Sequence, residues 1–229
     1  MKKQDIIFII VVILLLLPFF LFPAVYDCYK ALNKEHGMIM SFVKFAILST
    51  AGEAIGLRLS KGVYNYKGFG LIPRALVWGV FGLGIKMAMV IFSSGTPVFL
   101  EYLGVKDAVS SMAISTLGWK KVFVAFCVST AMNCIFAPVF MTLHKISDTH
   151  ILNSGGTLRG FFSRINFGEI SQKLNWKVQW NFVFAKTIPF FWIPAHTITF
   201  ILPEEWQVLF AALLGVALGV ILSFANRKK

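Results

Sequence analysis

Residues 75–92 read ALVWGVFGLGIKMAMVIF, an apolar run in which Lys86 is the only charged side chain. An α-helix rises about 1.5 Å per residue, so nearly 20 apolar residues can cross the ~30 Å hydrocarbon core of a bilayer. A helix is expected because lipid offers no hydrogen-bond partner to an unpaired backbone. This stretch therefore predicts a membrane-spanning helix.

Five more apolar runs share this pattern. They cover residues 6–26, 38–57, 122–143, 180–202 and 206–225. Hydrophobic types make up 57% of the 229 residues and charged types 14%, whereas soluble domains are nearer half apolar and a quarter charged. These values exclude an ordinary soluble globule and a disordered chain. We expect an all-α polytopic membrane protein with about six transmembrane helices, forming a single membrane domain over residues 1–229.

The first run follows Lys2 and Lys3 and so has the basic start of a signal peptide. No Ala-x-Ala cleavage pattern lies near residues 22–24, so we expect a retained extra helix over residues 6–26. The segment also lacks the Arg- and Ser-rich composition of a mitochondrial transit peptide. We therefore expect a bacterial plasma membrane, with an organelle membrane as the alternative.

The basic residues are distributed unevenly along the chain. Lys and Arg number 22 against ten Asp and Glu, a net charge of +12. If the N-terminus is cytoplasmic and six runs span, 14 of the 22 basic residues fall on the cytoplasmic side, as the positive-inside rule requires. The sequence therefore predicts an N-in/C-in topology. The basic residues occupy four separate segments without a binding motif, so we expect no nucleic-acid partner.

Two connections have features of their own. We expect residues 97–103 to form a short helix at the outer membrane interface. Residues 144–179 form the longest loop, in which apolar and basic residues alternate. This loop either contacts anionic head groups or gates a pore, or it is a plain surface connector.

Charged and polar side chains within the runs are the candidate functional residues, because a desolvated charge needs a partner or water. We expect Lys86 and Glu53 to face the interior, as an ion pair or in a wet cavity. Shallower groups such as Lys44 and Lys186 can extend to the interface. The candidates for a polar lining are Glu53, Lys86, Lys186, His196, Asn133 and Arg74. Of these, Arg74 is expected at the cytoplasmic mouth.

The fifth run contains two prolines five residues apart. Pro189 and Pro194 remove backbone donors and predict a kinked helix, with Trp192 between them. His196 follows and is either a packing residue or part of the lining. An intramembrane enzyme using His196 and Glu53 is a minor alternative. We expect no enzymatic activity, metal or cofactor, because no triad, Walker, Rossmann or zinc pattern occurs.

Small residues recur at helical spacing in three runs, which lets helix backbones approach closely in lipid. They are Gly52 with Gly56, Gly79 with Gly82, and Ala211, Gly215, Gly219 and Ser223. Packing within one bundle is the favoured interpretation. A homo-oligomer joined along Ala211 to Ser223 is the alternative. The three cysteines, Cys28, Cys127 and Cys134, are interpreted as ordinary packing residues.

An ordered set of residues suggests a family. It comprises Tyr29, Leu32, His36, Leu48, Gly52 and Glu53, then Arg74, Gly79 and Gly82, then Trp192, Pro194, Thr199, Phe200, Pro203, Leu222 and Ser223. This set resembles the integral membrane family of the peroxisomal twenty-two-kilodalton membrane protein and its inner-mitochondrial relatives, over residues 29–223. The resemblance implies a compact helical protein, often drawn with four helices, that forms a pore for small solutes or supports metabolite balance.

We therefore expect a channel or transporter-like protein for small solutes in the lipid bilayer. A non-catalytic scaffold or assembly factor acting through helix–helix contacts is the alternative. A continuous water path past Lys86 would favour transport, whereas a dry bundle with Lys86 in a salt bridge would favour the scaffold.

Overall fold

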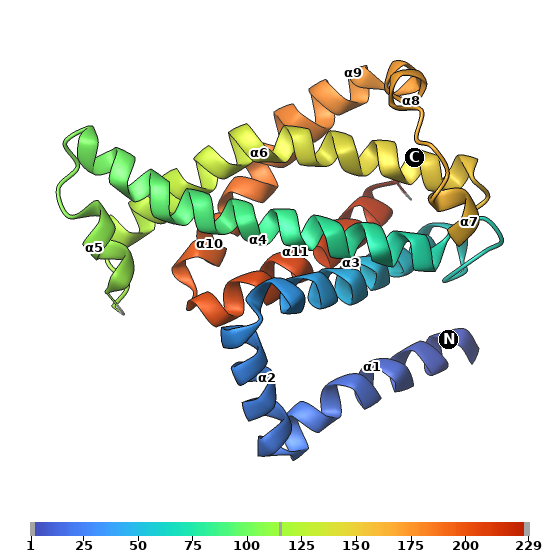
Figure 1. Cartoon of the computed structure of the whole chain (residues 1–229), viewed down its shortest axis with the longest axis horizontal. Helices are drawn as coiled ribbons and strands as arrows, with labels where there is room; N and C mark the ends of the chain where they lie inside the picture. The colour runs from blue at the N-terminus through green and yellow to red at the C-terminus, as the bar shows by residue number, and fades with distance from the viewer. Residues whose placement is uncertain (1–2, 115, 227–229) are drawn as a thin grey trace.

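The computed structural model describes residues 3–114 and 116–226 and is helical over most of these ranges, without a strand (Figure 1). Within the described ranges, four helices are long and apolar enough to cross a membrane. They are α1 (Lys3–Leu21), α3 (Gly37–Lys61), α4 (Leu71–Tyr102) and α6 (Trp119–Asn153). These helices overlap the first four apolar runs, so the all-helical fold and its membrane character are confirmed at this level.

The last two apolar runs are also helical. Residues 180–202 fall in η1 (Gln179–Trp192) and α10 (Ile193–Ile201), and residues 206–225 fall in α11 (Glu204–Asn226). That these segments complete six spans stays a prediction. The candidates Gly219 and Ser223 lie in the part of α11 whose side chains are outside the described residues.

Close helix packing forms the centre of the molecule. Helix α3 packs against α4 on one side and α11 on the other, while α6 packs against α4 and α10 (Figure 1). A Cβ added at Gly82 would lie 2.7 Å from the Ser41 carbonyl oxygen, and one at Gly52 would lie 2.9 Å from Val216 Cα. The expectation that small residues pack within one bundle is confirmed at these positions.

Three other small residues that the sequence singled out, Gly79, Ala211 and Gly215, also lie where helices pack closely. A Cβ at Gly79 would overlap the ring of Phe42 on α3. Ala211 is buried, and Gly215 faces Ser49 of α3. Ala211 and Gly215 therefore pack inside this chain, while a homo-oligomer along the rest of that stripe stays a prediction.

The first apolar run ends earlier than expected. Helix α1 stops at Leu21, Phe22 is extended, and Pro23 begins α2 (Pro23–Glu35), where its missing N–H costs no helical hydrogen bond. Figure 1 shows α1 lying alongside the bundle but apart from it, and no residue of α1 is buried. Its start is held by Arg58, which donates to Asp5 at 2.7 and 2.8 Å.

Two predicted connections are wrong in detail. Residues 97–102 are not a separate interfacial helix, because α4 continues through Pro97 to Tyr102. The Ser94 hydroxyl back-bonds to the Val90 carbonyl at 2.8 Å in the turn before Pro97. A separate short helix, α5 (Ala108–Ala113), follows instead.

The predicted loop 144–179 begins as helix, because α6 extends to Asn153. Its last turns bury Ile146, His150 and Ile151. His150 Nε2 lies 3.1 Å from the Phe161 carbonyl oxygen, and Ile151 packs against Gly70. Three short helices follow, α7 (Leu158–Phe161), α8 (Phe167–Lys173) and α9 (Trp176–Val178).

One end of the bundle gathers segments that the charge pattern assigns to the cytoplasm. The end of α3, the start of α4 and the end of α6 meet there (Figure 1). The two connecting loops touch, because a Cβ at Gly156 would lie 2.5 Å from the Gly68 carbonyl oxygen. We call the end formed by residues 58–74 and 144–164 the basic end.

The fifth run changes helix type between its two prolines. Residues 179–192 form a π-helix, which becomes an α-helix at Ile193. The Ile193 N–H bonds to the Ile188 carbonyl, five residues back, and the Thr187 hydroxyl bonds to the Val183 carbonyl at 2.6 Å. The predicted irregularity is therefore present as a π-to-α junction flanked by Pro189 and Pro194.

Candidate functional site

A buried arginine joins three helices at the basic end. Arg74, on α4, has a side chain only 5% exposed. Its guanidinium forms ion pairs with Glu53 of α3 and Asp148 of α6, and its Nε donates to the Phe69 carbonyl at 2.8 Å. The guanidinium also lies 4.3 Å from the centre of the Phe69 ring. One cation therefore balances two carboxylates from different helices.

The remaining oxygen of Glu53 has partners of its own. Trp78 Nε1 donates to Glu53 Oε1 at 2.8 Å, and His144 Nε2 lies 3.2 Å from the same atom. The rings of Trp78 and His144 lie 4.5 Å apart between their centres. Both carboxylate oxygens of Glu53 therefore have partners. We call the group of Glu53, Arg74, Trp78, His144 and Asp148 the charged cluster.

Three members of the charged cluster have metal-ligating atoms. The relevant atoms of Glu53, His144 and Asp148 all lie within 4.8 Å of one another. Arg74 already contacts both carboxylates, so a cation between them would meet a fixed positive charge. The geometry fits an ion-pair network better than a metal centre.

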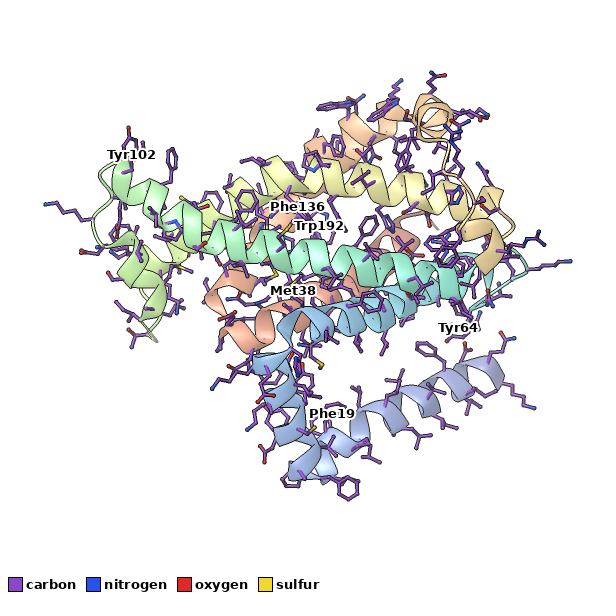
Figure 2. All side chains as sticks on the ribbon, viewed as in Figure 1. Phe19, Met38, Tyr64, Tyr102, Phe136 and Trp192 are labelled. Atoms are coloured by element: carbon purple, nitrogen blue, oxygen red, sulfur yellow. The ribbon has the colours of Figure 1, made fainter. Side chains whose placement is uncertain are left out.

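A cavity of about 340 Å³ begins beside this cluster and lies between α3, α4, α6, η1, α10 and α11. This volume is at the lower end for ligand-binding pockets. Its aromatic lining consists of Phe45, Trp78, Phe136, Phe140, Phe182 and Trp192. Phe136 and Trp192 are labelled near the middle of the bundle in Figure 2, and both line the cavity. The exposed residues Lys145 and Phe182 also line the cavity, so it opens to the outside at η1.

Polar groups line the cavity at two levels. Glu53, His144, Lys145 and Gln179 lie toward the basic end. Asn133 and His196 lie deeper, where Asn133 Nδ2 is 3.0 Å from His196 Nδ1 and donates to the Ser129 carbonyl at 2.8 Å. His144 and Asn133 are 11 residues apart on α6, which is roughly 16 Å at the helical rise. This length is about half the ~30 Å thickness of a hydrocarbon core.

The far end of the cavity is closed by packed side chains. Val124, Ala125 and Val128 of α6 have no exposed surface, and Phe200 and Ala212 pack in the same core. Among the side chains that the structure describes, the cavity is thus a pocket open at one end and does not continue as a pore through the bundle.

The structure brings several predicted candidates together. Glu53, Asn133 and His196 line the cavity, together with Trp192, Gly52 and Gly215. Arg74 lies at the basic end of the bundle, where the sequence predicted the mouth, but it is buried behind Glu53 and does not line the cavity. Lys186 is exposed and does not line the cavity.

The predicted Glu53–Lys86 pair is wrong. Lys86 Nζ lies 3.0 Å from Glu204 Oε1 at the start of α11, and the Glu204 side chain is 79% exposed. Glu53 pairs instead with Arg74, which precedes Lys86 by 12 residues, or roughly 18 Å along α4. The two expected partners therefore lie at different depths in the bundle.

Sequence reasoning missed several residues of this site. His144 and Asp148 fell in a predicted loop, although their i, i+4 spacing places them on one face once α6 is extended. Ser49, Trp78 and Lys145 carried no pattern of their own. Their roles depend on which helix faces them.

No family model, no curated protein and no solved structure matches this chain. The resemblance to the peroxisomal membrane protein family therefore stays a prediction, and the geometry of the cavity carries the functional proposal.

Proposed function

We propose that this protein is a transporter-like membrane protein that binds a small solute in the cavity between α3, α6 and η1. The observation that carries the proposal is the cavity itself, which runs from the basic end to Asn133 and His196 and then stops at a packed core. A pocket open on one side suits a protein that exposes a central site alternately to the two sides of a membrane.

The irregular fifth helix supports the same function. Secondary transporters often build their midplane sites from discontinuous helices, whose irregular backbone is tolerated where it lines a cavity. Here Trp192 and His196 lie on either side of the π-to-α junction, and both line the cavity. The irregular part of the fifth helix thus borders the proposed solute-binding cavity.

The lining favours a solute over bare ions. Most lining side chains are aromatic or aliphatic, and Glu53 is already paired with Arg74. An ion stripped of water needs rings of carbonyls or charges to replace its hydration. We therefore prefer a transporter-like protein to an ion channel.

The proposed topology has six spans with both termini and the basic end in the cytoplasm, in a bacterial plasma membrane. Cysteines introduced at Lys106 and Arg159 test it, after replacement of the native Cys28, Cys127 and Cys134 by serine. A membrane-impermeant maleimide added to intact cells should label position 106 and leave position 159 unlabelled. Labelling of position 159 but not of position 106 would show that the protein has the opposite orientation.

Two observations favour a membrane scaffold as the second candidate. Lys86 is held in a salt bridge and does not line the cavity. Helix α1 has no buried residue and presents a long apolar surface. Photo-crosslinking from Leu14 of α1 that traps another membrane protein, with no solute flux from folded protein, would favour the scaffold.

Flux from proteoliposomes tests the transport function. The panel is erythritol, phenylalanine and 4-hydroxybenzoate, which cross pure lipid slowly and span polar to amphiphilic chemistry. Gly215→Leu places a side chain in the cavity, because a Cβ there meets only Ser49 Oγ at 3.7 Å. Gly84→Leu is the matched control, because a Cβ there has no atom within 4 Å among the described residues.

We expect the wild type and Gly84→Leu to transport at least one panel member, and Gly215→Leu to lose most of that flux. A folded wild type that moves none of the three solutes would overturn the proposal. Equal flux through Gly215→Leu would show that solute takes another route.

A further inference from the structure

We infer that the cavity takes a mostly apolar molecule, about the size of a substituted aromatic ring, whose acceptor oxygen is bound by the Ser49 hydroxyl and the Trp192 indole N–H. This inference rests on the proposed function in one respect, that the same cavity is the solute site. It adds the chemical class of the solute.

The Ser49 hydroxyl is a buried donor without a partner. The side chain lines the cavity from α3 and is 3% exposed, and no described residue hydrogen-bonds its Oγ. Hydroxyls elsewhere in these helices bond back to a carbonyl four residues earlier, as Thr142 does to Pro138 and Thr187 does to Val183. The hydroxyls of Ser49, Thr50 and Thr130 lack such a bond among the described residues, and of these three residues Ser49 alone lines the cavity.

The Trp192 indole gives the second unpartnered donor. Its Nε1 is buried without a hydrogen bond among the described residues, although a buried indole N–H usually finds an acceptor. The ring lies in the cavity wall, with its centre 5.3 Å from that of His196. An indole N–H donates and never accepts, so the missing partner must carry an acceptor atom.

The rest of the lining determines the body of the solute. Phe45, Phe136, Phe140 and Phe182 surround the volume, which equals that of about 11 water molecules at ~30 Å³ each. Water in such surroundings would lack most of its hydrogen bonds, whereas an aromatic body would stack against the rings. The one carboxylate in the lining, Glu53, is paired with Arg74, and the lining cation Lys145 lies at the exposed mouth, so the inner lining does not require a charged body.

Both donors and the aromatic lining therefore point to one chemistry. An acceptor oxygen on an apolar ring, as in a ketone, ester or ether, offers these donors a partner and leaves the remaining surface to apolar contact. A fully apolar ring of the same size would leave both donors unpaired.

The test compares two fluorinated probes on the full-length protein in nanodiscs. 4-Fluoroacetophenone carries a carbonyl oxygen, and 1-fluoro-4-isopropylbenzene, the hydrocarbon probe, has nearly the same size without it. Titrations followed by ¹⁹F NMR should show saturable binding of the ketone, tighter than that of the hydrocarbon probe by about fivefold or more. Equal affinity of the two probes, or no saturable binding of either, would overturn the inference.

Variants assign the effect to the two donors. Ser49→Ala should weaken ketone binding about fivefold and leave binding of the hydrocarbon probe unchanged, because it removes one donor and little apolar surface. Trp192→Phe removes the second donor together with part of the ring, so it should weaken ketone binding about fivefold more than it weakens binding of the hydrocarbon probe. Thr50→Ala is the matched control, since its hydroxyl is also buried and unpartnered but does not line the cavity. Equal weakening by Thr50→Ala would contradict the assignment.

Thermal unfolding of each variant in the same nanodiscs shows whether that variant is folded. If Trp192→Phe does not fold, Ser49→Ala alone decides. Flux of erythritol blocked by Gly215→Leu, with no preference for the ketone, would overturn this inference and leave the transport proposal standing. Preferential binding of the ketone without flux of any panel solute would overturn the transport proposal and leave the inferred binding chemistry standing.

Discussion

Replacement of Arg74 by alanine should destabilise the bundle by about 3 kcal/mol. Arg74 is the cation between Glu53 and Asp148, whose side chains are 19% and 20% exposed. Removal of one member of a buried ion pair typically costs 3–5 kcal/mol, because the partner charge stays buried. Glu53 keeps its bonds from Trp78 and His144, so the lower end of that range is expected.

The assay is thermal unfolding of the purified protein in mild detergent, followed by size-exclusion chromatography with fluorescence detection. For a chain of this length, 1 kcal/mol shifts Tm by roughly 2–4 °C, so Arg74→Ala should lower Tm by roughly 6–12 °C. Arg159→Ala is the matched control, because Arg159 is exposed on α7. Its Tm should stay within about 2 °C of the wild type.

A second variant separates charge from packing. The triple change Arg74→Met, Glu53→Gln and Asp148→Asn removes the cation and both carboxylates together. It should be more stable than Arg74→Met alone, since no unpaired charge remains. A Tm for Arg74→Ala equal to that of Arg159→Ala, or a triple variant no better than the single one, would refute the reasoning.

Three further predictions use the same unfolding assay. Gly82→Ala should cost about 1–3 kcal/mol, because its Cβ would meet backbone of α3 at 2.7 Å, whereas Gly84→Ala should be neutral or slightly stabilising. Asn133→Ala should cost about 1–3 kcal/mol, because its buried hydrogen bonds to α6 and α10 are lost. Lys86→Ala should cost less than about 1 kcal/mol, since Glu204 is solvent-exposed, and a larger loss would indicate a shielded pair.

Local sequence pattern predicted much of the fold and part of the site. Runs of apolar residues located every long helix, because a helix must satisfy its own backbone in lipid. The spacing of Gly79 and Gly82 predicted a close helix contact, which α3 makes. The two prolines predicted the irregular fifth helix. These features are local, since each depends on residues within a few turns of one another.

The ion pairing could not be predicted in the same way. Glu53 and Lys86 looked like partners because they carry opposite charges inside two of the predicted spans. Their depths depend on where α3 and α4 begin and on how the helices are offset, which pairs Glu53 with Arg74 and Lys86 with Glu204. Helix ends are set by capping and tertiary contacts, so the sequence left this offset open.

By itself, the sequence determined that this protein is helical and built for a membrane, because hydrophobicity and backbone hydrogen bonding act over a single segment. Only the tertiary structure decided that a cavity exists, that Ser49 and Trp192 line it with unpartnered polar atoms, and that Arg74 pairs with Glu53 beside its basic end. The physical reason is that these properties belong to the space between helices. That space depends on the offset and rotation of each helix relative to its neighbours.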